Sequence, residues 1–114
     1  MSRKSDIAKL ERIAGLIDDT YEIIGRHGTA ESTLKDKEGQ YAILMCISQI
    51  GELLSKLEAD DLIDKLPVRE ANAMRNVIIH NYEGVNLRIV KRTLHDNLPE
   101  LRAAVRSILA AEHI

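Results

Sequence analysis

The chain has 114 residues, of which 45% are hydrophobic and 30% charged, a composition typical of one folded domain and not of a disordered segment. Its formal net charge of -2 argues against a protein that coats nucleic acid non-specifically. No apolar run approaches the ~18 residues that a membrane span needs, and the polar start leads into an amphipathic pattern, so we expect no membrane association and a cytoplasmic location.

A spacing of three to four residues between apolar side chains dominates residues 1–114, which predicts a single all-α domain, an antiparallel bundle of four to five helices. The first helix is indicated by Ile7, Leu10, Ile13, Ile17, Tyr21 and Ile24. Ser5 is a reasonable N-cap for it, and Gly25 and Gly28 are expected to end it. Residues 26–39 are polar and predict a loop or a short irregular helix.

A second helix is predicted over residues 40–57, with a continuous stripe made of Ile43, Ile47, Ile50, Leu54 and Leu57. Further apolar side chains lie to one side of the stripe, which suits a helix central to a bundle or one shared between a core and a dimer contact. Gly51 could permit a close approach of another helix, whereas Glu52 is either a supporting contact for a site or a solvent-exposed side chain. The sole cysteine, Cys46, predicts a small buried side chain and no disulfide.

Residues 60–64 hold three aspartates without a neighbouring histidine, which resembles a solvated turn more than a metal site, so we predict no metal. We predict no cofactor either. Pro67 is expected to open the third helix, with an inward stripe that comprises Ala71, Met74, Val77 and Ile78, and Gly84 to stop it. Asn86 can cap a fourth helix. Residues 97–100 resemble a capping box that opens a fifth helix; the alternative is one long helix kinked at Pro99.

The third helix carries a motif of polar side chains near its end. On an ideal helix Asn76 and His80 are one turn apart on the same face, whereas Arg75 and His80 are separated by roughly 140°, so a second surface is needed to bring those two together. A guanidinium can hold phosphate oxygens, and an imidazole titrates near neutrality, as phosphodiester chemistry requires. Spacing alone leaves an alternative open, in which His80 only complements the helix dipole and Arg75 only reaches solvent.

The run Arg75-Asn76-x-x-x-His80-x-Tyr82, with the residues that follow it to Leu101, resembles the HepT-like toxins of the HEPN superfamily. The resemblance covers most of the chain and is strongest over residues 66–109. It implies a HEPN-like helical homodimer whose paired motifs form a metal-independent RNA endonuclease site. It also implies the toxin of a type II toxin-antitoxin system, neutralised by a cognate MNT-like nucleotidyltransferase antitoxin that modifies Tyr82 with AMP.

In this reading Arg75 and His80 are the catalytic residues, and Asn76 and Tyr82 support them. In-line transesterification needs a base and an acid on opposite sides of the phosphate, so His80 of each subunit could serve in turn, and Arg75 would stabilise the dianion. Residues 65–114 carry 8 basic and 5 acidic side chains, the reverse of the first half. Four cations near the motif are predicted to bind RNA phosphates, with a merely solvated face as the alternative: Arg69, Arg88, Lys91 and Arg92.

Two other functions fit the same residues. One is a non-catalytic helical subunit that docks a nucleotidyltransferase and binds nucleotide through the motif. The other is a plain structural dimer, in which neither Arg75 nor His80 affects RNA. Cleavage separates the enzyme from both, because only an enzyme produces new RNA ends.

Overall fold

The computed structural model describes residues 2–80 and 84–112, and within these ranges the chain is helical or in turns, with no strand. This confirms the predicted all-α class. None of the described helices is both long and apolar enough to cross a membrane. In chain order the elements are α1 (Ser2–His27), α2 (Ala30–Lys35), α3 (Lys37–Ser55), α4 (Asp60–Ile63), α5 (Val68–His80), α6 (Leu87–Arg92), the π-helical turn η2 (Thr93–Asn97) and α7 (Leu98–Glu112).

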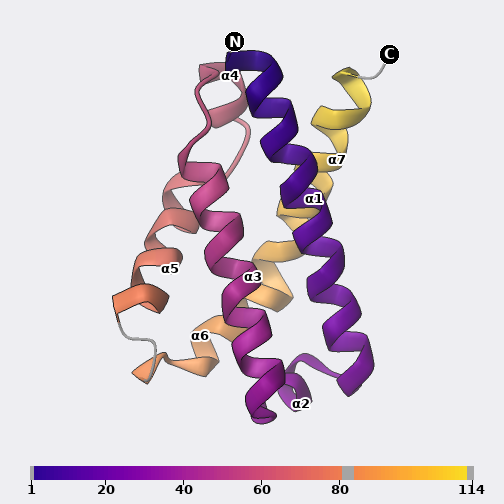
Figure 1. Cartoon of the computed structure of the whole chain (residues 1–114), viewed down its shortest axis with the longest axis vertical. Helices are drawn as coiled ribbons and strands as arrows, with labels where there is room; N and C mark the ends of the chain where they lie inside the picture. The colour runs from indigo at the N-terminus through magenta and orange to yellow at the C-terminus, as the bar shows by residue number, and fades with distance from the viewer. Residues whose placement is uncertain (1, 81–83, 113–114) are drawn as a thin grey trace.

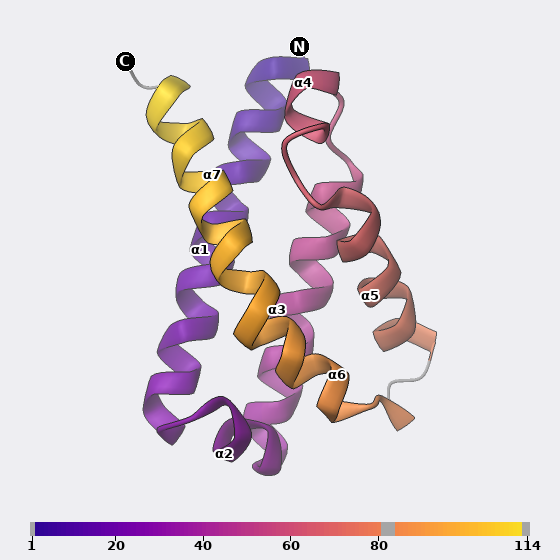
Figure 2. The same cartoon turned by 180° about the vertical axis from the view of Figure 1, so that it is seen from behind.

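Helix α3 lies in the middle of the bundle, with α1 on one side and α5 on the other (Figure 1). These three helices alternate in direction along the long axis, and the run from α6 to α7 crosses their other face (Figure 2). Helix α7 packs mainly on α1, whereas α5 packs mainly on α3. The predicted antiparallel bundle is therefore confirmed, and α5 is held chiefly through one neighbour.

The core consists of aliphatic side chains that the helical period had singled out. All five members of the stripe predicted for residues 40–57 are buried, although Leu57 lies just beyond the end of α3. Leu10, Ile13 and Ile17 of α1 are buried too. Two further helices supply the fully buried side chains Val90 and Val105. Because α3 contributes buried residues toward both α1 and α5, its wide apolar surface is explained by its central position.

Two predicted boundaries of the first helix are wrong. Helix α1 already begins at Ser2, so Ser5 is not its N-cap, and Gly25 lies inside it. Gly28 does end the helix: it has a φ of 96° and donates its N–H to the Ile24 carbonyl at 2.9 Å. The short-helix alternative for residues 26–39 is the one that forms, because the Thr29 side chain caps α2.

The predicted break between a fourth and a fifth helix is also wrong, and the alternative of one continuous helix is the one that forms. Asn86 caps α6 as predicted, but the chain then stays helical through η2 into α7, so residues 97–100 do not form a capping box. The Leu98 N–H bonds to the Thr93 carbonyl, five residues back. Pro99 has no N–H and its ring crowds the preceding turn, which explains why the helix widens just before it instead of ending.

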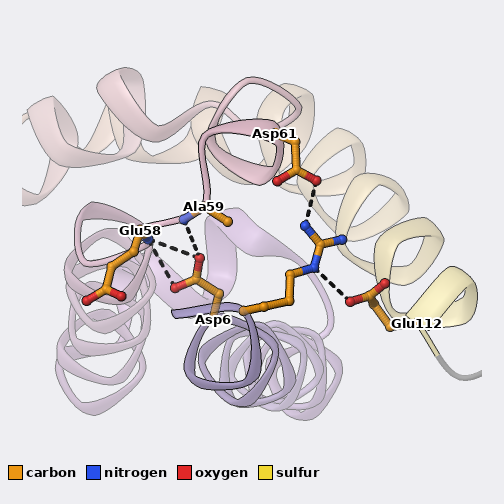
Figure 3. A network of polar contacts seen from close by, with 6 residues as sticks. Asp6, Glu58, Ala59, Asp61 and Glu112 are labelled. Atoms are coloured by element: carbon orange, nitrogen blue, oxygen red, sulfur yellow. Dashed lines mark hydrogen bonds and ion pairs between the residues drawn. The ribbon is translucent and has the colours of Figure 1, made fainter. Parts of the chain in front are cut away.

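Near the chain's first turn, a buried carboxylate joins α1 to the start of α4. Asp6 is fully buried, and its two oxygens accept the N–H groups of Glu58 and Ala59 at 2.7–3.0 Å (Figure 3). On the same helix, Arg3 donates to Asp61 at 2.6 Å and to Glu112 at 2.9 Å. These contacts connect α1, α4 and the end of α7, and the pairing with Glu112 and Asp61 raises the pKa of Arg3.

We predict that Asp6→Ala lowers the free energy of unfolding by about 1–3 kcal/mol, because two partly buried N–H groups lose their acceptor. Asp6→Asn should cost less, since its amide oxygen can still accept one of these bonds. Chemical denaturation measures both changes. Asp19→Ala, at an exposed position of the same helix, is the matched control, and equal losses for Asp6→Ala and Asp19→Ala would contradict the assignment.

Candidate active site on helix α5

Helix α5 spans Val68–His80, so it begins within a residue of the start predicted at Pro67. The stop predicted at Gly84 follows residues 81–83, which lie outside the described part of the chain. Ile78 is fully buried, and Ala71 and Met74 are partly buried against the core. Val77 was predicted to point inward, but it is 43% exposed. The prediction fails because Val77 lies about 120° around the helix from Ala71, outside the sector that faces α3.

Gly51 determines how closely α5 approaches α3. A Cβ atom placed on Gly51 would lie 2.8 Å from the Ala71 carbonyl oxygen and 2.9 Å from the Arg75 Cβ, both too short for a real contact. Only glycine therefore permits this spacing, as the sequence had indicated. The backbone that carries Arg75 is thus held directly against the central helix.

Arg75 is half-buried beside this contact, and its Nη1 donates to the Asn76 Oδ1 at 3.4 Å. The structure therefore brings two of the predicted site residues together. Among the residues described, no carboxylate forms an ion pair with Arg75, so its guanidinium is not neutralised within this part of the chain. Asn76 is exposed.

The remaining motif residues are only partly covered. His80 is the last residue of α5, but its side chain lies outside the described part of the chain, and so does the whole of Tyr82. Their roles as proton-transfer residue and modification site stay predictions. The helix nevertheless provides the rigid support that the sequence had predicted for the start of the motif.

Three exposed apolar side chains lie on the same flank of the α3–α5 layer as Arg75. Measured around α5 from Ala71, Arg75 and Ile79 lie at about +40° and +80°. Measured around α3 from Gly51, Tyr41 and Met45 lie at about +80° and +120°. Because α3 and α5 run antiparallel, positive angles on the two helices point to the same side of the pair. Tyr41, Met45 and Ile79 are 44%, 56% and 50% exposed. We call these three residues and Arg75 the α3–α5 face.

Glu52 also lies toward this flank, and its carboxylate is 3.2 Å from the Lys56 Nζ. Its side chain is 42% exposed, and no ion pair with Arg75 occurs within the described ranges. Of the two readings from sequence, the solvent-exposed glutamate is the one that these contacts favour.

Sequence reasoning missed Ile79 as part of the α3–α5 face, although its position one turn after Arg75 could have indicated it.

The four cations predicted to bind phosphate are all exposed but do not form one cluster. Arg69 is in the first turn of α5, whereas Arg88, Lys91 and Arg92 are on the short helix α6. Lys91 is 3.2 Å from Glu31 of α2, and this pairing, followed by that with Lys35, lowers the pKa of Glu31. Lys91 is therefore directed toward α2, a contact that the sequence did not indicate.

Two other sequence predictions concern metal and thiol chemistry. Within residues 2–80 and 84–112, no group of three histidine, cysteine or acidic side chains is close enough to hold a metal ion. Cys46 is buried, as predicted, and its burial raises the pKa of the thiol. Neither observation adds a nucleophile or a metal ligand to the α5 site.

Comparison with known proteins is consistent with this helix arrangement. Residues 7–108 match the family described as HepT-like, ribonuclease HepT-like. The chain is 34% identical over 95 residues to "Probable ribonuclease HepT" of Thermococcus cleftensis, an alignment that covers 82% of this chain and 86% of that one. It is 36% identical over 84 residues to a "Putative RNase" of Caldanaerobacter subterraneus, which covers 72% and 75%. No solved structure matches significantly.

An all-helical bundle with the Arg-x4-His motif on one helix defines a protein of the HEPN class. This chain belongs to the HepT-like ribonuclease family of that superfamily. The resemblance found in the sequence is thereby confirmed, while the roles of individual residues stay predictions.

We predict that Gly51→Ala lowers the free energy of unfolding by about 1–3 kcal/mol, because the added methyl group must push α5 away from α3. Gly15→Ala is the matched control: nothing lies within 4 Å of its Cβ position, and it is also inside a helix. That control should raise stability by about 0.5–1 kcal/mol through helix propensity. Urea denaturation of both variants tests this, and stabilisation by Gly51→Ala would contradict the close contact.

Proposed function

We propose that this chain is a metal-independent RNA endonuclease whose active site forms where two copies meet. Family membership supports ribonuclease activity. The observation that carries the proposal is the position of Arg75, half-buried against Gly51 and without a carboxylate partner in the described ranges. A guanidinium held in this way can bind a phosphate without first breaking an internal ion pair.

In the proposed reaction the RNA 2′-hydroxyl attacks the adjacent phosphate, and the bond to the 5′-oxygen breaks to leave a 2′,3′-cyclic phosphate. His80 of one copy takes the hydroxyl proton, and His80 of the other copy, or water, protonates the leaving oxygen. Arg75 stabilises the negative charge on the pentacoordinate phosphate, and Asn76 holds a phosphate oxygen or orients His80. No step needs a metal ion.

The α3–α5 face supports the dimer. Tyr41, Met45 and Ile79 expose about half of their surface on the same flank as Arg75, and burying such side chains would favour association. A two-fold axis through this face would bring the two copies of Arg75 toward one cleft, since a two-fold interface uses the same patch on both subunits. An in-line displacement needs its acid and base on opposite sides, which two copies of His80 can supply.

Two finer roles follow from the family resemblance. Arg69, Arg88, Lys91 and Arg92 would attract RNA phosphates toward the motif, with Lys91 contributing only when it leaves Glu31. The chain would act as the toxin of a type II toxin-antitoxin system, and its MNT-like nucleotidyltransferase antitoxin would attach AMP to Tyr82. A charged nucleotide at that position would block the cleft by its bulk and repel substrate phosphate.

We predict that purified, unmodified protein cleaves total cellular RNA in excess EDTA, and that Arg75→Ala and His80→Ala each reduce the rate about 100-fold or more. Arg106→Ala and His95→Ala, at exposed positions on α7 and η2, are the matched controls and should keep full activity. Gel analysis of RNA ends measures cleavage, and intact-protein mass excludes an adduct. If dimeric, unmodified protein makes no new ends, the docking-subunit function is favoured instead.

We further predict that Met45→Glu and Ile79→Glu each shift the protein from dimer to monomer, because a charge would have to be buried in the interface. Both variants should also lose RNase activity. Ile89→Glu, at a residue on α6 that is 46% exposed, is the control and should stay dimeric. Sedimentation velocity measures the change. A dimer that persists in both variants would move the interface elsewhere on the molecule.

A further inference from the structure

A pocket of about 280 Å³ opens between α5 and the π-helical turn η2. Its floor comes from Ile47 and Ile50 of α3, one wall from Met74 of α5, and the other wall from Leu94 and Leu98. The α5 wall packs closely on α3, whereas α5 has little contact with η2 or α7, which leaves the space between the two walls. π-helical turns occur frequently at functional sites, and here one forms a wall of the pocket.

The pocket lies on the opposite flank of α5 from the RNase motif. Around α5, Met74 is at about −60° from Ala71, whereas Arg75 is at about +40°. A molecule in the pocket would therefore not touch the α3–α5 face, where the second copy is proposed to bind. The pocket is a separate site, and its occupancy does not depend on whether the chain cleaves RNA.

Among the residues that the structure describes, the polar side chains that line the pocket are Glu70, Thr93 and Asn97, and of these only the Asn97 amide brings a hydrogen-bond donor that is not already used. Within the described part of the chain, Glu70 is the one ionisable side chain that lines it, and it forms no ion pair there. The Thr93 hydroxyl donates to the Ile89 carbonyl at 3.1 Å, so toward the pocket it can only accept. A carboxylate without a nearby cation in the lining disfavours an anionic ligand, including an RNA phosphate, and favours a cationic one.

We propose that this pocket binds a compact apolar molecule that carries one protonated amine. The apolar body would fill the space beside Met74, and the ammonium group would lie at the rim against Glu70 and Thr93. A cavity of about 150 Å³ with a similar aliphatic lining is enough to hold benzene, so this one can accommodate a ring with a short side chain. Pockets of this kind, between helices of a bundle and with few polar groups, are typical small-molecule sites.

The test uses the intact protein, labelled with ¹³C at its methionine methyl groups and titrated with 2-phenylethylamine. Met74 lines the pocket, whereas Met45 lies on the opposite flank and serves as an internal reference. We expect the Met74 methyl signal to shift in a saturable way at about millimolar amine, while the Met45 signal stays unchanged. The uncharged isostere 2-phenylethanol should bind several-fold more weakly.

A variant that removes the charge of Glu70 distinguishes binding of the ammonium group by this carboxylate from attraction of the amine to any acidic side chain on the surface. Glu70→Gln should weaken amine binding about 3- to 10-fold. Glu100→Gln, at an exposed carboxylate that lines only the neighbouring hollow, should not change it. No Met74 shift at about 10 mM amine would overturn the proposal. Equal affinities for the amine and the alcohol would overturn the proposal too. So would a Met74 signal that shifts only with protein concentration, because that result would mean that a second copy of the chain fills the pocket.

Discussion

The contact between α3 and α5 at Gly51 is the constraint on which the rest of the arrangement depends. A side chain there would collide with the Ala71 carbonyl and with Arg75, so the two helices can meet at this distance only through a glycine. Because α5 is held mainly by α3, this one contact sets both the depth of α5 and the direction in which its side chains project. The polar contacts of Asp6 and Arg3 join α1 to the start of α4 and to the end of α7, and they involve no residue of the motif.

Helix α5 packs mainly on α3, so it has two flanks that α3 does not cover, and the two flanks carry different kinds of side chain. One flank carries Arg75 and Ile79 and continues onto Tyr41 and Met45 of α3, so it combines a cation with exposed apolar surface. The other carries Glu70 and Met74 and faces the apolar pocket beside η2. The first combination suits a second protein chain and a phosphate between the copies, whereas the second suits a small cationic ligand.

Local electrostatics explain how a chain with a net charge of -2 can act on RNA. The second half of the chain carries the motif and is net positive, while many of the acidic side chains of the first half lie in ion pairs or caps far from it. The Lys91 ion pair with Glu31 shows that even the basic half is partly neutralised by tertiary contacts. Arg75 is the cation among the described residues of the motif, and within the described ranges its guanidinium bonds only weakly to Asn76, so in the proposed function it can bind a phosphate without first breaking an ion pair.

By itself the sequence determined the all-α class, the central helix with its buried stripe, the glycine of close approach and the family to which the motif belongs. The helices and the buried stripe follow from the spacing of apolar residues along the chain. The close approach and the family follow from residue types at fixed positions, the glycine at 51 and the Arg-x4-His motif. Only the tertiary structure decided that Val77 faces outward, that Lys91 turns to Glu31, and that Pro99 sits behind a π-helical turn instead of a new helix start. The first two depend on which element lies opposite the side chain, and spacing along a chain carries no information about that element. For the third, the sequence allowed both a new helix start and one continuous helix, and only the structure shows that the chain stays helical.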